Sequence, residues 1–225
     1  MGHASASFSV TLPRWRVAWW FAWRSLCCLW MWTWYRSRCW GGHHIPTRGP
    51  VLLVSNHQSF LDPMLIGMGC NRRPFFSLAR ATLFDYPLFG RLIRSLNAIP
   101  VRQGKSDKRA MQHCIDVLRA GHTLMVFPEG SRTDDGQTQP FSPGTMLLIK
   151  RGRPRVVPVA IEGAYEAWPR GQAPRLTGRV FVQYGRPVDA QTLIDMGRDE
   201  ALGYLFDRVE SMRQELSRRL AGSNS

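Results

Sequence analysis

Two short clusters of polar residues could carry chemistry, and the first lies at 56–62. His57 comes directly after VLLVSN (51–56), an apolar run typical of a buried strand, and Asp62 follows five residues later. A neutral histidine can take a proton from a hydroxyl group, and such a base contributes roughly 10²- to 10⁴-fold in rate. A nearby carboxylate fixes the tautomer of the ring and stabilises the imidazolium. His57 and Asp62 are therefore candidates for a general base and the acid that orients it.

The spacing of these two residues restricts how they can meet. In a regular helix, side chains five residues apart point about 140° away from each other. A turn that leads into a helix would bring them together more easily, and Pro63 supplies a break at the right place. Taken alone, the pair is explained equally well by a helix-capping aspartate beside an incidental histidine.

The second cluster, FPEGSRT (127–133), also follows an apolar run. Gly130 allows a positive φ angle or a close approach of the backbone to a ligand. Arg132 offers a planar pair of donors that suits a phosphate group. The alternative is an ordinary charged turn in which Glu129 pairs with Arg132, an exposed pair that would contribute little.

The pattern between and around these clusters alternates between strands and helices. We expect strands at 51–56, 74–79, 97–101, 123–128, 155–161 and 179–188, and helices at 63–68, 88–96, 106–121 and 200–220, the third of these capped by Ser106 or Asp107. This order predicts an α/β fold with a mainly parallel mixed sheet flanked by helices. In such sheets, ligands gather beyond the carboxyl ends of the strands, where both polar clusters would lie.

The charge of the chain indicates an anionic partner. The 225 residues carry 30 Lys and Arg against 16 Asp and Glu, which gives a formal net charge of +14. Nucleic acid, acidic lipid headgroups and phosphorylated substrates all fit such a surface. The five cysteines are odd in number and form no CxxC pair, as expected of reduced thiols in a cytoplasmic protein.

Eight of the nine tryptophans fall between Trp15 and Trp40, so we predict a separate membrane-associating segment, 1–42, before a catalytic domain, 43–225. The arginines at 16, 24, 36 and 38 interrupt the run, which is too polar for a membrane span. Tryptophan favours the membrane interface, and interleaved arginines would face lipid phosphates, each worth about 1 kcal/mol. We expect an interfacial helix or a short helical hairpin, with a tryptophan-rich core helix as the alternative. Five tryptophans would share one side at helical spacing: Trp15, Trp19, Trp23, Trp30 and Trp34.

Taken together, the two polar clusters form a specific combination. A strand ending in NHxxxxD, followed about seventy residues later by a strand ending in FPEGSR, resembles the glycerolipid acyltransferase family, which includes the bacterial 1-acylglycerol-3-phosphate acyltransferases. LFDYPLFGRLIRSLNAIPVRQG (83–104) and VVPVAIEG (156–163) resemble the two remaining blocks of the family, in the expected order. The resemblance covers roughly residues 50 to 165.

The resemblance implies a reaction. His57 would deprotonate the free hydroxyl of a lysophospholipid, with Asp62 orienting the imidazole. That oxygen would attack the thioester of acyl-CoA or acyl-carrier protein, which serve as co-substrates. No cofactor, metal or covalent enzyme intermediate would be needed, and 1-acylglycerol 3-phosphate as acceptor would give phosphatidic acid.

The resemblance also implies substrate-binding residues. Glu129 and Gly130 would shape the acceptor site, and Arg132 would bind its phosphate. Arg80 occupies a position where the family often has a lysine, and Arg102 lies in the second block. We expect both to bind substrate.

The chain departs from the family pattern at a few positions. Asn97 and Gln103 stand where the family tends to have a glycine and an arginine, and Arg102 comes one place early. Ser142 stands where the family usually has a lysine. Because positive charge is missing at two expected sites, the acceptor could also be another lyso-lipid, such as a lyso-aminolipid.

Three functions therefore compete. The first is an acyltransferase that is peripheral or monotopic at the cytoplasmic face of the membrane, with anionic lipids, the lysophospholipid and the acyl donor as partners. The second is a lipid esterase or thioesterase in which His57 activates water. The third, a nucleic-acid-binding protein, rests on charge alone. No sequence signature of a nucleic-acid-binding module supports it, so we expect no nucleic-acid partner.

Overall fold

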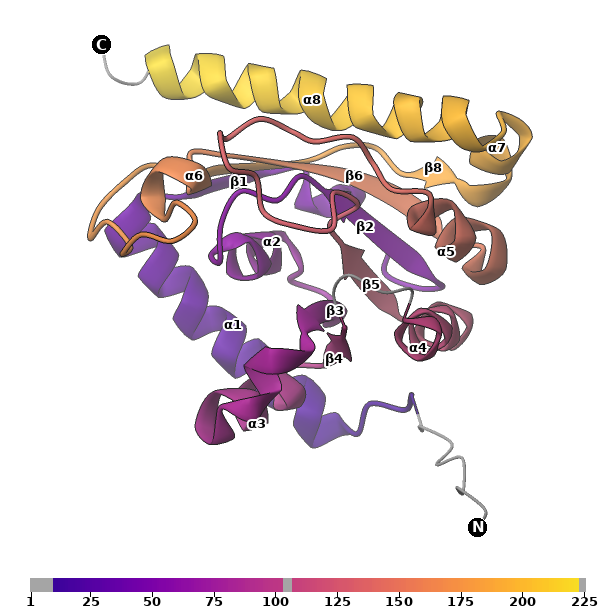
Figure 1. The fold of residues 1–225 in the computed structure, drawn as a ribbon. Coiled ribbons are helices and arrows are strands. Elements are labelled where there is room, and N and C mark those ends of the chain that lie inside the picture. Colours follow the sequence, from indigo (N-terminus) through magenta and orange to yellow (C-terminus); the bar gives the residue numbers. More distant parts are fainter. Residues whose placement is uncertain (1–9, 103–106, 223–225) are drawn as a thin grey trace.

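The computed structural model describes residues 10–102 and 107–222, and Figure 1 shows a sheet with helices on both sides. The strands are β1 (Arg38–Trp40), β2 (Val51–Ser55), β3 (Phe75–Arg80), β4 (Ala98–Val101), β5 (Thr123–Val126), β6 (Arg155–Glu162), β7 (Phe181–Tyr184) and β8 (Val188–Asp189). The α-helices are α1 (Arg14–Tyr35), α2 (Asp62–Gly69), α3 (Pro87–Ser95), α4 (Lys108–Arg119), α5 (Gly144–Gly152), α6 (Ala164–Ala167), α7 (Ala190–Asp195) and α8 (Arg198–Gly222). Two short 3₁₀ helices are η1 (Gly42–His44) and η2 (Ala81–Asp85).

The strands form one mixed sheet in the order β1-β7-β6-β2-β5-β3-β4, and β8 pairs beside β6. Strands β2, β3, β4, β5 and β6 run parallel, whereas β6 pairs antiparallel with β7 and β8. The prediction of a mainly parallel mixed sheet is confirmed. Because β2 lies at the centre, its carboxyl end is flanked by the carboxyl ends of β5 and β6.

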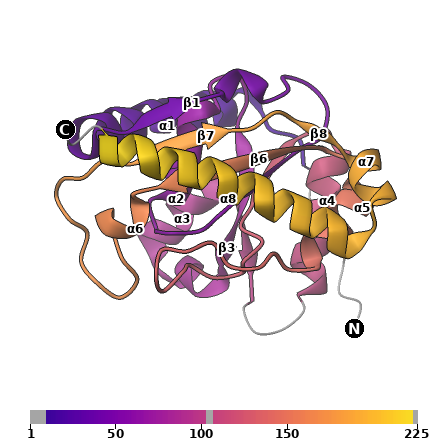
Figure 2. The ribbon, with the colours of Figure 1, turned by 90° about the horizontal axis from the view of Figure 1, so that it is seen from above.

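Both faces of the sheet are buried, which explains why its central strands read as continuous apolar runs. Side chains alternate along β2, so that Leu52 and Val54 pack on one face while Val51 and Leu53 pack on the other. Helices α4, α5, α7 and α8 cover the first face, and α1 and α2 cover the second (Figures 1 and 2).

The tryptophan-rich segment forms a single helix, α1, which packs against the domain along one side. Trp20, Met31 and Tyr35 are buried in the same apolar cluster as α2 and the second face of the sheet. Trp15 and Trp32 project outwards, each with 67% of its surface exposed. Among the described residues, no helix combines the length and apolar character needed to cross a membrane.

Two arginines of α1 correct the expectation that the interleaved arginines face lipid phosphates. Arg24 donates through Nε to the carbonyl oxygen of Gly67 (2.8 Å) and through Nη2 to that of Met68. These carbonyls lie in the last turn of α2, where backbone oxygens lack helical partners and attract positive charge. Arg16 donates through Nη2 to Asn97 Oδ1 at 2.9 Å. Both guanidinium groups therefore fasten α1 to the domain.

Strand β1 also belongs to the predicted segment 1–42, and it joins the sheet. Arg38, Cys39 and Trp40 pair in parallel with β7 at the edge of the sheet. Residues on both sides of the predicted boundary between 1–42 and 43–225 therefore pack together in one core and one sheet.

The prediction of one strand over 179–188 was wrong. The structure has two short strands, β7 and β8, separated by residues 185–187. Gly185 leaves the ladder and donates its N–H to the carbonyl oxygen of Pro158 (2.8 Å). Pro187 has no N–H to contribute, so the pairing with β6 stops and resumes further along.

Candidate active site

His57 and Asp62 meet at the carboxyl end of β2. His57 Nδ1 lies 2.7 Å from Asp62 Oδ2, and the same oxygen accepts the backbone N–H groups of Gln58 (2.7 Å) and Ser59 (2.8 Å). The turn between them curls around the carboxylate, which is fully buried at the first residue of α2. Pro63 suits this start because a helix leaves its first N–H groups unpaired. The prediction that the pair meets across a turn into a helix is confirmed.

The remaining ring nitrogen of His57 can act on a substrate. Because Nδ1 donates to the Asp62 carboxylate, Nε2 keeps its lone pair. The ring stacks on Phe127, with the centroids 3.9 Å apart and the planes 9° from parallel. Phe127 therefore covers one face of the imidazole, and 19% of the side chain remains exposed. A hydroxyl group at Nε2 could give up its proton there.

The FPEGSRT loop holds His57 through its backbone. The N–H of His57 donates to Glu129 Oε1 (3.0 Å), and the N–H of Thr133 donates to the carbonyl oxygen of His57 (2.9 Å). On the other side, the Asn56 amide both donates to and accepts from the backbone of Ile161, each at 2.9 Å. The two polar clusters of the sequence thus form one rigid unit at the sheet edge.

Glu129 is a carboxyl group with an unusual charge state. Burial raises the pKa of Glu129 to about 8, and the N–H of His57 opposes this only in part. At neutral pH the group is mostly protonated, so it adds little negative charge beside His57. A protonated Glu129 does not repel an anionic substrate.

Gly130 and Arg132 complete the loop. Gly130 has a φ of +77°, in the left-handed region that favours glycine, and a Cβ there would meet nothing within 4 Å. Backbone conformation, rather than crowding, therefore calls for glycine. The Arg132 guanidinium carbon lies 3.6 Å from the centre of the Phe60 ring, a cation–π contact. Burial, followed by the positive charges of Arg170 and Arg80, lowers the pKa of Arg132.

Arg80 and Arg102 lie along the same edge of the sheet. Arg80 ends β3, and Arg102 directly follows β4, two strands away from β5. Arg80 is close enough for its charge to act on Arg132. Arg102 is exposed, and its backbone N–H donates to Asp107 Oδ2 (3.1 Å). His57 thus contacts both Asp62 and Glu129 directly. Of the predicted site residues, Arg102 lies farthest from His57 along the edge of the sheet. Gln103 lies outside the described residues.

A buried polar network behind the site was missed by sequence reasoning. Gln58 Nε2 donates to Glu162 Oε2 (3.1 Å), and Arg213 Nη1 donates to the same oxygen (3.1 Å). Gln58 Oε1 accepts the N–H of Ala164 (3.1 Å). The network ties the His57 turn to β6 and α8. No motif or periodicity could have indicated it, since Arg213 lies 155 positions after Gln58 and reaches it only through the fold.

Asn97 shows why one departure from the family pattern is tolerated. Its φ is +67°, and asparagine adopts this left-handed conformation more readily than most residues. Its amide also accepts from Arg16 and donates to the carbonyl oxygen of Phe75 (3.4 Å). At another departure, Ser142, the backbone N–H donates to the carbonyl oxygen of Pro128 (3.0 Å), so the FSPG stretch lies against the FPEG strand end.

Comparison with known proteins agrees with this geometry. The family model described as Acyltransferase matches residues 36–162, which is more than half of the chain. The chain belongs to the acyltransferase family. The matched region contains His57, Asp62 and Glu129, which are in direct contact through His57, and Arg132 of the same loop as Glu129.

Individual relatives narrow the comparison. The chain is 27% identical to the chloroplastic 1-acyl-sn-glycerol-3-phosphate acyltransferase BAT2 of Brassica napus, over 74% of this chain and 50% of that protein. It is 32% identical to the lyso-ornithine lipid O-acyltransferase of Pseudomonas aeruginosa, over 56% of this chain and 48% of that protein. The crystal structure of the 1-acyl-sn-glycerophosphate acyltransferase of Thermotoga maritima superposes with a TM-score of 0.77 at 27% identity, covering 88% of this chain and 79% of that one. The chain spans about half the length of the curated relatives it matches.

Proposed function

We propose that the protein transfers a fatty acyl group from a thioester donor, acyl-CoA or acyl-carrier protein, to the free hydroxyl of a lysophospholipid. The acceptor that we favour is 1-acylglycerol 3-phosphate. The observation that carries the proposal is the 2.7 Å contact between His57 and the buried Asp62 at the carboxyl edge of the sheet. The family membership supports the reaction class, and the names of the Brassica and Thermotoga proteins support the acceptor.

The geometry suits direct transfer. Nε2 of His57 takes the proton of the acceptor hydroxyl as its oxygen attacks the thioester carbonyl carbon. The C–S bond breaks, the thiolate leaves, and the imidazolium returns the proton to the sulfur. Asp62 accepts from Nδ1 throughout and stabilises the positive ring.

The charges around the dyad suit an anionic acceptor. Arg132 offers two parallel donors beside the His57 turn, and Arg80 and Arg102 add positive charge along the edge. Glu129, mostly protonated at neutral pH, shapes the site together with Gly130 without adding a full negative charge.

A lyso-ornithine lipid is a second candidate acceptor. The Pseudomonas relative of that name has a higher identity than the Brassica or Thermotoga protein, over a shorter stretch. The missing charges at Gln103 and Ser142 fit an acceptor without a phosphate monoester.

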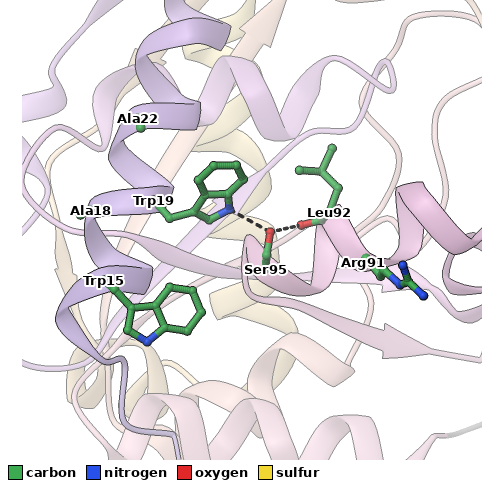
Figure 3. Close-up of a pocket in the computed structure, with 7 residues that line it drawn as sticks. All are labelled: Trp15, Ala18, Trp19, Ala22, Arg91, Leu92 and Ser95. Atoms are coloured by element: carbon green, nitrogen blue, oxygen red, sulfur yellow. Dashed lines mark hydrogen bonds between the residues drawn. The ribbon is translucent and has the colours of Figure 1, made fainter.

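We further propose that α1 holds the protein against anionic lipid at the cytoplasmic face of the membrane. Trp15 and Trp19 line an open groove of about 710 Å³ between α1 and α3, with Leu92 and Arg91 on the opposite wall (Figure 3). Leu88 on α3 is 82% exposed. Apolar rings and chains beside arginines are what an interface of acyl chains and headgroup phosphates binds.

An acyl-transfer assay with the purified protein, residues 1–225, tests the proposal. Each donor is paired in turn with 1-acylglycerol 3-phosphate, lyso-ornithine lipid and no acceptor. We expect diacylated product with 1-acylglycerol 3-phosphate and little free thiol without an acceptor. Rapid thioester hydrolysis that does not depend on acceptor would instead support the esterase reading, and product with lyso-ornithine lipid alone would support the second candidate.

A further inference from the structure

The loop after α6, residues 168–178, lies beyond the region matched by the family model, yet it packs against the His57 turn. The Trp168 ring lies 5.3 Å from the Phe60 ring, centre to centre. Ser59 Oγ donates to the carbonyl oxygen of Trp168 (3.1 Å). The loop therefore forms a wall of the site beside Phe60, the ring on which Arg132 lies.

This wall carries a second arginine next to Arg132. Arg170 Nη1 lies 3.1 Å from Asp134 Oδ1, and Asp134 follows Arg132 by only two residues. The carbonyl oxygen of Asp134 accepts the Tyr165 hydroxyl (2.8 Å), which fixes the loop there. After burial, the charge of Arg170 contributes most to lowering the pKa of Arg132, ahead of that of Arg80, whereas the charge of Asp62 opposes the shift. The two guanidinium groups are thus close enough for their charges to act on each other.

A substrate group could replace Asp134 as the partner of Arg170 at little cost in free energy. The Arg170 side chain is 45% exposed and Asp134 is 79% exposed, and exposed ion pairs of this kind contribute little. A phosphate monoester carries a charge of about −1.5 to −2 at neutral pH and has three strong acceptor oxygens. Such a group can accept from two arginines at once and relieve their mutual repulsion, whereas a neutral headgroup cannot.

We propose that Arg170 is a specificity-determining residue, which joins Arg132 to form a two-arginine site for the phosphate monoester of the acceptor. Asp134 holds Arg170 in place until the phosphate arrives. This inference rests on the proposed function, because it assigns the headgroup end of the same acceptor site.

Acceptor binding in the absence of donor tests the inference without depending on turnover. Calorimetry would measure the Kd of a short-chain 1-acylglycerol 3-phosphate and of the phosphate-free 1-acylglycerol. The proteins are the wild type, Arg170→Gln and the control Arg175→Gln. Arg175 is an exposed arginine of the same loop, whose backbone is bonded to Ala167 and Tyr35.

We expect Arg170→Gln to raise the Kd of the phosphate ligand about 10-fold or more, as the loss of a charge-assisted pair of hydrogen bonds would. The phosphate-free ligand should bind equally to all three proteins, and Arg175→Gln should stay within twofold of the wild type. A change below twofold in Arg170→Gln, or equal weakening of both ligands, would overturn the inference. Turnover in the same proteins decides the proposed function separately: Arg170-dependent binding without acyl transfer would contradict the reaction and leave the two-arginine site standing.

Discussion

His57 is held from three directions in the structure. Asp62 binds its Nδ1, Phe127 stacks on its ring, and Glu129 accepts its backbone N–H. Only the spacing of His57 and Asp62 and the nearby FPEG motif were visible in the sequence. The stacking and the backbone contact join residues about seventy positions apart, so they depend on β2 and β5 lying side by side.

The raised pKa of Glu129 predicts a pH dependence of stability. Between its usual pKa of 4.5 and its folded value of about 8, the folded protein keeps a proton that the unfolded chain has released. The unfolded state binds fewer protons in this window, so this group lowers stability as pH rises through it. We expect Glu129→Gln to remove that component.

Urea unfolding of both proteins at several pH values measures this effect. The free energy of unfolding of Glu129→Gln, relative to that of the wild type, should increase from pH 5 to pH 8 and level off above pH 8. A difference that stays constant across this range would show that Glu129 ionises normally in the folded protein.

Two substitutions of Asn97 should lower the free energy of unfolding to different extents. Asn97→Ala should lower the free energy of unfolding by about 1–3 kcal/mol, because alanine is strained at positive φ and removes one of the two acceptors of Arg16, leaving the carbonyl oxygen of Arg94. Asn97→Gly keeps the backbone conformation and loses only the amide contacts, so its loss should be smaller. Equal losses in the two variants would argue against backbone strain at this position.

At the scale of elements, α1 has two roles that its sequence does not separate. One side packs on α2 and the sheet through Trp20, Met31 and Tyr35, and the other side exposes tryptophans. Arg24 completes the contact by capping α2 at its carboxyl end, while Asp62 lies at the other end of that helix. The helix that we propose for membrane contact therefore touches the element that positions the catalytic dyad.

Because Arg24 caps α2, its substitution should destabilise the protein more than that of another arginine of α1. Arg24→Gln should lower the free energy of unfolding by about 1.5–3 kcal/mol, the usual range for hydrogen bonds to charged groups. Arg14→Gln, at the exposed start of the same helix, should change it by less than about 0.5 kcal/mol. Thermal unfolding compares the two, and similar effects would mean that the α2 cap adds no stability.

The elements that sequence reasoning predicted are those with a strong local pattern. Strands β2 and β5 are short apolar runs buried on both faces, and α4 is amphipathic with Asp107 as its N-cap, its side chain accepting the N–H of Ala110 (3.1 Å). Strand β1 was not predicted, because its three residues have no strand pattern and are held by pairing with β7. The break between β7 and β8 was missed because alternation continues across Pro187, where backbone pairing cannot.

The residues of the site likewise fall into two groups, those that belong to a local sequence motif and those that the fold brings in from distant segments. The dyad and the FPEG loop were predictable, since each follows an apolar strand within a specific motif. The Gln58–Glu162–Arg213 network and the Arg170 loop were not, because they come from β6, α8 and the segment after α6 and reach the site only through the fold.

At the scale of the whole molecule, the net charge of +14 and the exposed rings of α1 act together. Because α1 shares the core, point variants test membrane contact better than deletion of the segment. The double variant Trp15→Ser and Trp32→Ser should weaken binding to anionic vesicles by about 10-fold or more, since each ring would bury much apolar surface in the interface.

Co-sedimentation with vesicles of stated anionic lipid content measures this binding. Leu147→Ser is the matched control, because Leu147 is 41% exposed on α5, across the sheet from α1. It should bind vesicles as the wild type does. Unchanged binding of the double tryptophan variant would place the membrane contact elsewhere on the molecule.

The central claim is that His57 acts as the base in acyl transfer to a lysophospholipid, and one measurement tests it most directly. The initial rate of transfer from a thioester donor to 1-acylglycerol 3-phosphate is compared among the wild type, His57→Ala and His43→Ala, an exposed histidine of η1. We predict that His57→Ala loses at least about 10²-fold in rate while its circular dichroism and thermal unfolding match the wild type, and that His43→Ala keeps full activity. Near-normal turnover by a folded His57→Ala protein would contradict the account.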